Sequence, residues 1–110
     1  MPGISIHVVD VSRGLVAAGM RVEIFYDKEK ILGGATSAKG LIEDGKVFEP
    51  GAYEAVFHVA DWFRAQGVAL PQVPFLDVVT FRFGIDDPRQ HYHLPFKCTP
   101  WGYSCFRGGA

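Results

Sequence analysis

Apolar and polar residues alternate along much of the chain, a pattern that predicts short β-strands with one buried face and one wet face. In residues 4–11, for example, Ile4, Ile6 and Val8 share one face, whereas His7 lies on the other. Turns rich in glycine and proline separate the alternating segments. The predicted strands are residues 4–11, 20–26, 35–37, 46–48, 53–59, 76–85, 91–99 and 104–107.

One segment departs from this alternation. Residues 59–66 contain no glycine or proline and end at Gly67, which predicts a single helix of about two turns. Seven or eight short strands joined by turns are typical of an all-β sandwich. Since domains usually contain about 100 to 150 residues, we expect the 110 residues to form one domain, residues 1–110.

The composition argues against nucleic acid and membranes as partners of this chain. With 11 basic and 12 acidic residues, the chain lacks the excess positive charge that attracts a nucleic-acid backbone. No stretch approaches the roughly 18 apolar residues of a membrane span, and the start, MPGISIHVVDV, lacks the pattern of a secretion signal. We therefore expect a soluble, cytoplasmic protein that binds neither nucleic acid nor membrane. The apolar fraction of 48% is high for one small core, which suggests a subunit interface.

Three histidines are the strongest candidates for chemistry. His7 lies on the polar face of the first predicted strand, and His91 and His93 share one face of a late strand, because strand side chains repeat every two residues. An imidazole has an unperturbed pKa near 6.5, which suits general acid–base catalysis at neutral pH. From spacing alone, three interpretations stay open: histidines bonded to backbone or water, acid–base catalysis, and a metal site.

The metal interpretation is weakly supported, because a histidine pair two residues apart needs a third ligand from elsewhere in the chain. Cys98 and Cys105 are too few to define a disulfide framework, and we expect both to be reduced. Near the C-terminus, Arg107 precedes Gly108 and Gly109, an arrangement that fits either a ligand carboxylate or carbonyl, or a frayed end. We expect no metal and no cofactor.

Three stretches of the chain match the pattern of a known family. They are IHVVDVSRGLVAAGMRVEIF at the start, PGAYEAVF before the predicted helix, and HYHLPFKCTPWGYSCFRGGA at the end. The combination of HYHxP with GYSxxRG is highly specific, and the match runs nearly from end to end. The chain is similar to the transthyretin-related proteins, particularly the 5-hydroxyisourate hydrolases.

The resemblance implies an all-β, transthyretin-like β-sandwich of two four-stranded sheets with one short helix. It also implies a homotetramer, a dimer of dimers, whose sites lie in a channel between the dimers. The implied activity is metal-free hydrolysis of an amide bond in the six-membered ring of 5-hydroxyisourate, an oxidation product of urate. On the model of transthyretin itself, the alternative is a non-catalytic protein that binds a small molecule in the same channel.

Carried over residue by residue, the resemblance assigns the catalytic roles to His7 and His93. These residues would orient and deprotonate the attacking water and hydrogen-bond the ring, for which apposed imidazoles of different pKa are suited. His91 would support them, and Arg107 and Gly109 would help to bind the substrate.

Two departures from the family pattern concern substrate binding. The family arginine follows T-x-x-x-G, and the matching stretch TSAKGL ends in Leu41, whereas a second register would place Lys46 there. The terminal YRGS motif is FRGG here, so that Phe106 and Gly109 lack two hydroxyl groups, and Ala110 follows. Losing the cation and a hydroxyl would lower the rate on an anionic ring on the order of 10² to 10³-fold. The more apolar site suits a less charged relative, such as an N-methylated hydroxyisourate.

Overall fold

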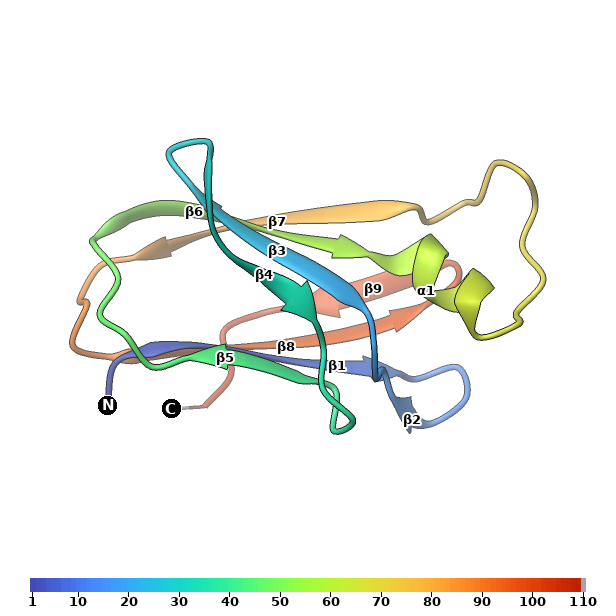
Figure 1. Ribbon diagram of the computed structural model, residues 1–110, viewed down its shortest axis with the longest axis horizontal. Coiled ribbons are helices and arrows are strands. Elements are labelled where there is room, and N and C mark those ends of the chain that lie inside the picture. Colours follow the sequence, from blue (N-terminus) through green and yellow to red (C-terminus); the bar gives the residue numbers. More distant parts are fainter. Residues whose placement is uncertain (110) are drawn as a thin grey trace.

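The computed structural model describes residues 1–109, which form two β-sheets packed face to face with a helix at one end (Figure 1). The first sheet contains β1 (Gly3–Asp10), β2 (Leu15–Val16), β5 (Leu41–Asp44), β8 (His91–Thr99) and β9 (Gly102–Cys105). The second contains β3 (Arg21–Tyr26), β4 (Glu29–Ala35), β6 (Gly51–His58) and β7 (Val78–Ile85). The helix, α1, spans Val59–Ala65 and is too short to cross a membrane, as is every helix of the described residues.

The central pair of the first sheet is β1 and β8, which run parallel. The strand order is β2-β1-β8-β9, and β5 also pairs with β1. Because β5 pairs with residues 4–7 and β2 with residues 9–10, these two strands share one edge of β1. The second sheet has the order β4-β3-β6-β7 and is antiparallel throughout.

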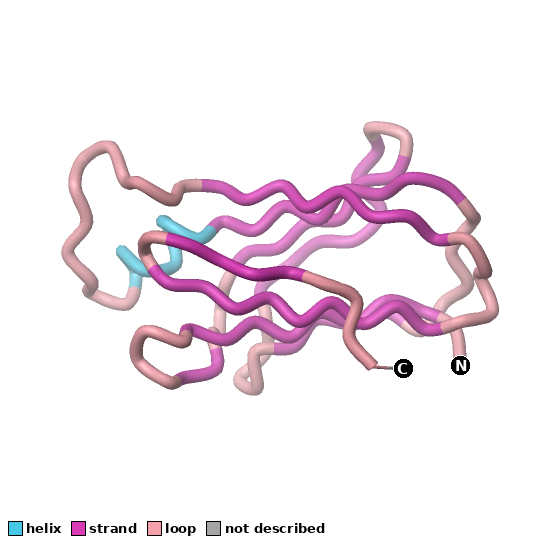
Figure 2. Tube along the Cα trace, turned by 180° about the vertical axis from the view of Figure 1, so that it is seen from behind, coloured by secondary structure: helices cyan, strands magenta, loops and turns pink. Residues whose placement is uncertain are grey.

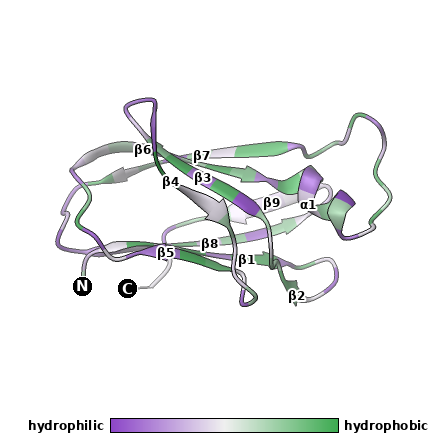
Figure 3. Ribbon diagram, viewed as in Figure 1, coloured by the Kyte–Doolittle hydropathy of each residue, from purple (hydrophilic) through white to green (hydrophobic). Residues whose placement is uncertain are grey.

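The core lies between the two sheets and is almost entirely apolar. Side chains that point inward from β1 and β8, such as Ile6, Val8 and Phe96, are fully buried. The ring of Phe96 stacks on that of Phe57 from β6, with 3.8 Å between the ring centroids. Figure 3 shows hydrophobic stretches in strands of both sheets. Burial of each such side chain contributes about 1.5 to 3 kcal/mol, so the alternate residues of these strands are fixed facing outward.

The β-sandwich fold and the single short helix are confirmed, but two predicted strands are wrong. Residues 35–37 and 46–48 were predicted as strands, whereas β4 and β5 occupy residues 29–35 and 41–44. The tight turn before β4 uses Asp27 and Lys28, both with positive φ, in place of the Asn-Gly or Asp-Gly pair that signals such a hairpin. The first sheet has five strands in place of the expected four, because the two-residue β2 pairs with the end of β1.

Candidate active site

The candidate catalytic residues lie on the outer face of the first sheet. Ser5 and His7 project there from β1, and His91 and His93 from β8, because they alternate with residues buried in the core. The parallel register places Ser5 beside His93, and His7 beside Pro95. His7 is therefore two residues further along β1 than the partner of His93, in a diagonal position on the neighbouring strand. The two imidazoles share one patch and are close enough for His7 to lower the pKa of His93.

Ser5 links two of the three histidines. Its hydroxyl oxygen lies 2.7 Å from Nε2 of His91 and 2.7 Å from Nδ1 of His93, and only 5% of the residue is exposed. The other ring nitrogen of His91, Nδ1, lies 3.1 Å from the carbonyl oxygen of Pro2. Ser5 was not among the residues predicted from the sequence, although its position two residues before His7 on the same strand face was an available signal.

His7 is held at the other edge of this patch. Its Nε2 lies 3.1 Å from the carbonyl oxygen of Lys39, and because a carbonyl only accepts, Nε2 carries the hydrogen. In the neutral ring Nδ1 is then the acceptor nitrogen. The pairing of β1 with β5 places Leu41 directly beside His7, on the same face of the sheet. An aliphatic side chain therefore lies next to this imidazole.

Lys46 makes its contacts at the far end of β5. Its ammonium nitrogen lies 3.6 Å from the carboxylate of Asp44 and 5.2 Å from the centroid of the Phe48 ring. Leu41, in contrast, is the cross-strand neighbour of His7. The geometry therefore favours the register in which Leu41 occupies the position after T-x-x-x-G.

The C-terminal segment that follows β9 passes in front of β8 in Figure 2. The backbone N–H of Gly108 donates a hydrogen bond of 2.7 Å to the carbonyl oxygen of His93. A Cβ atom at Gly108 would lie 2.8 Å from Cδ2 of His93 and 2.8 Å from Cγ of Pro95, so a glycine is required there. Gly109 has open space around it, and Ala110 lies outside the described residues.

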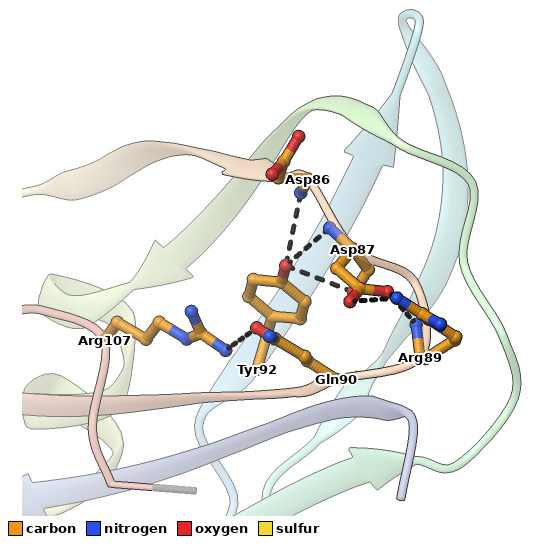
Figure 4. A network of polar contacts seen from close by, with 6 residues as sticks. All are labelled: Asp86, Asp87, Arg89, Gln90, Tyr92 and Arg107. Carbon is orange, nitrogen blue, oxygen red and sulfur yellow. Dashed lines mark hydrogen bonds and ion pairs between the residues drawn. The ribbon is translucent and has the colours of Figure 1, made fainter.

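Arg107 anchors this segment (Figure 4). Its guanidinium carbon lies 4.1 Å from the centroid of the Tyr92 ring, and its Nη2 donates to the Gln90 side chain and the His91 carbonyl oxygen, each at 3.1 Å. Backbone N–H groups of residues 86 and 87 hold the Tyr92 hydroxyl in turn. These contacts give Arg107 a positioning role, whereas its expected contact with substrate stays a prediction.

The electrostatics of the patch favour a neutral His93. Burial lowers the pKa of His93 below its usual 6.5, and repulsion from His7 and His91 lowers it further. A neutral imidazole accepts a proton, so His93 is available as a general base at neutral pH and somewhat below it.

The cysteines lie away from this chemistry. Both are free, and burial raises the pKa of Cys98 and of Cys105 to about 12, which keeps the thiols protonated and poorly nucleophilic. Within residues 1–109, no group of three or more His, Cys, Asp or Glu side chains is arranged to hold a metal ion.

Known proteins share both the sequence pattern and the fold. Residues 4–108 match the model of the HIUase/Transthyretin family. The chain belongs to this family. It is 43% identical to the 5-hydroxyisourate hydrolase of Deinococcus radiodurans, over 97% of this chain and 96% of that protein. The solved 5-hydroxyisourate hydrolase of Klebsiella pneumoniae matches with a TM-score of 0.86 at 28% identity, over 99% of this chain and 100% of that one.

A further solved structure, that of (S)-allantoin synthase, matches with a TM-score of 0.87 at 31% identity. The match covers 97% of this chain but only 43% of that longer chain. Together the comparisons confirm the resemblance inferred from the motifs and the transthyretin-like sandwich.

We expect the pKa of His93 to rise in His7→Gln, because one of the repelling charges is removed. The rise should stop short of 6.5, since burial and His91 still lower the pKa. NMR titration of the histidine Cε1–H signals measures this. The matched control is His58→Gln, which removes an imidazole that pairs with Glu23 on the second sheet. Equal His93 titrations in both variants would contradict the predicted coupling.

Proposed function

We propose that this chain hydrolyses the cyclic amide bond in the six-membered ring of 5-hydroxyisourate, or of a closely related ring, in purine catabolism. The proposal rests on the patch that contains His7 and His93. Ser5 and Lys39 occupy one ring nitrogen of each, which leaves Nδ1 of His7 and Nε2 of His93 to contact substrate or water. Support comes from relatives that match over nearly their whole length and bear the name 5-hydroxyisourate hydrolase.

In this mechanism His93 is the general base. Its Nδ1 is bonded to Ser5, so Nε2 accepts a proton from water as the water oxygen attacks the amide carbon. His7 accepts a hydrogen bond from a ring N–H through Nδ1, because its Nε2 is bonded to Lys39. His93 then gives its proton to the leaving ring nitrogen as the C–N bond breaks, and the ring opens to a carboxylic acid, which loses its proton to solvent at neutral pH.

Leu41 changes which rings the site favours. In its position beside His7 it offers no cation to an anionic ring or to the oxyanion of the tetrahedral intermediate. An aliphatic side chain packs instead against a methyl group, and burying one such group contributes about 0.8 kcal/mol. We therefore propose that N-methylated hydroxyisourates are turned over at least as well as 5-hydroxyisourate.

A homotetramer, built as a dimer of dimers, completes the proposal. Exposed apolar side chains lie on β2, at and beside the turn between β8 and β9, and in the C-terminal segment. Clusters of exposed apolar side chains mark subunit interfaces. In addition, β7 and β9 are edge strands that can extend both sheets into a second copy. The apolar side chains are Leu15, Val16, Trp101, Tyr103 and Phe106, which are between 43% and 69% exposed.

Light scattering should give a mass of four times the 12.1 kDa chain. Trp101→Asp should lower this mass, because it places a charge where 69% of an indole is exposed for contact. Val73→Asp, in a loop residue that is 83% exposed, is the matched control and should remain a tetramer. A monomeric wild type would contradict the assembly.

Activity is tested by following the ultraviolet decay of 5-hydroxyisourate made in situ by oxidation of urate. The wild type should accelerate the decay, and His93→Ala should lower kcat/KM by about 10² to 10⁴-fold because the base is lost. His7→Ala should lower it less, and His58→Ala should match the wild type. Equal rates for His93→Ala and wild type would refute this mechanism. If neither this ring nor N-methylated rings react, the non-catalytic binding alternative is favoured.

Leu41→Arg tests the substrate preference. Restoring a cation beside His7 should raise kcat/KM for 5-hydroxyisourate on the order of 10²-fold and lower the relative rate on N-methylated rings. Val73→Arg adds the same charge in an exposed loop and should leave both rates unchanged. If the ratio of the two rates is the same in both variants, Leu41 does not set the preference.

A further inference from the structure

Both ring nitrogens of His91 have hydrogen-bond partners, and the residue also faces a hollow at the surface. The supporting role expected for His91 accounts for neither feature. Its Nδ1 faces the Pro2 carbonyl oxygen and its Nε2 faces the Ser5 hydroxyl. The residue also lines a hollow of about 480 Å³ on the surface, together with Met1, Arg89, Gln90 and Arg107. A continuous line of polar atoms therefore leads from His93, through Ser5, to an imidazole beside solvent.

The hydrogen atoms along this line are determined by its end at Pro2. A carbonyl oxygen only accepts, so Nδ1 of His91 carries a hydrogen, and Nε2 of the neutral ring must accept. The Ser5 O–H therefore donates to His91, and the Ser5 oxygen accepts from Nδ1–H of His93. Nε2 of His93 is left with the lone pair, which is the arrangement that a general base requires.

We propose that Ser5 and His91 form a proton relay that carries the charge gained by His93 to the edge of the site. This inference rests on the proposed function. When Nε2 of His93 takes a proton from water, its Nδ1 proton passes to the Ser5 oxygen. The Ser5 proton passes in the same step to Nε2 of His91, which becomes the imidazolium. The reverse transfer restores His93 as the acid that protonates the leaving nitrogen.

The surroundings of each imidazole favour this movement of charge. An imidazolium at His93 would be partly buried under Gly108 and would repel a charge on His7. At His91 the same charge lies beside the Pro2 carbonyl and the hollow at the surface. Burial disfavours the charged form, so the relay lowers the cost of the step in which His93 accepts a proton.

Charged groups of both signs lie near the line. Glu43 is the register partner of Ser5 on β5, and Lys97 lies further along β8 on the same face. In the hollow, Arg89 is paired with Asp87 at 3.0 Å, whereas within residues 1–109 the groups that the Arg107 guanidinium bonds are neutral. Repulsion from Arg107 favours the return of the proton to His93, so the relay is reversible.

Long-range ¹H–¹⁵N NMR of the histidine rings tests the hydrogen positions. In the wild type, His93 and His91 should both show the Nδ1–H tautomer. Ser5→Ala should give a mixture of tautomers at His93 and lower kcat/KM on the order of tenfold to hundredfold, less than loss of the base itself. Ser5→Thr keeps the hydroxyl and should restore both the tautomer and most of the rate.

His91→Phe interrupts the line while keeping Ser5 and His93, so it serves if Ser5→Ala does not fold. The solvent-isotope dependence of kcat should be curved in the wild type, because several protons move together, and linear in His91→Phe. His58→Gln is the control and should retain the curvature. The relay would be overturned if His93 in the wild type carries the hydrogen on Nε2. It would also be overturned if Ser5→Ala and His91→Phe both keep the rate and the isotope curve of the wild type. The hydrolase activity itself would stand in either case. A wild type that hydrolyses none of the rings would overturn both.

Discussion

The parallel pairing of β1 with β8 determines which side chains meet on the outer face of the first sheet. It places Ser5 beside His93 and brings His91 within reach of the same hydroxyl. A slip of one residue would turn these polar side chains into the core, because strand side chains alternate between the two faces. Ile6 and Phe96, which are fully buried, hold the register from the other side. The core that stabilises the sandwich therefore also sets the geometry of the candidate site.

The C-terminal segment adds the second constraint on the site. Arg107 stacks on Tyr92 and so fixes the backbone that follows it, and Gly108 lies against the His93 ring. This covering excludes water from one side of the imidazole, which agrees with the lowered pKa of His93. In this structure Arg107 positions the segment, since its guanidinium is bound to β8 while Gly108 lies against the imidazole. Its contact with substrate stays a prediction.

The sequence pattern was sufficient to predict the fold and the family, but not the hydrogen bonds that connect the residues of the candidate site. Alternation and the two terminal motifs predicted the sandwich, the helix and the hydroxyisourate hydrolase resemblance, and these are confirmed. The bonds from Ser5 to His91 and His93 were missed because these partners are 86 and 88 residues away, a pairing that only the sheet register reveals. The pairing of β1 with β5 was likewise needed to place Leu41 beside His7. The single domain, the cytoplasmic location and the absence of a cofactor stay predictions.

The most direct measurement is a crystal structure of the protein with a bicyclic ureide analogue that lacks the scissile amide. The ring should lie on the outer face of the first sheet, in contact with His7 and Leu41. A water molecule should be held by Nε2 of His93 at about 3 to 3.5 Å from the position of the reacting carbon. If the analogue binds elsewhere, such as on the outer face of the second sheet, the proposed site is wrong. If it binds with Nε2 of His93 turned away from it, His93 is not the general base.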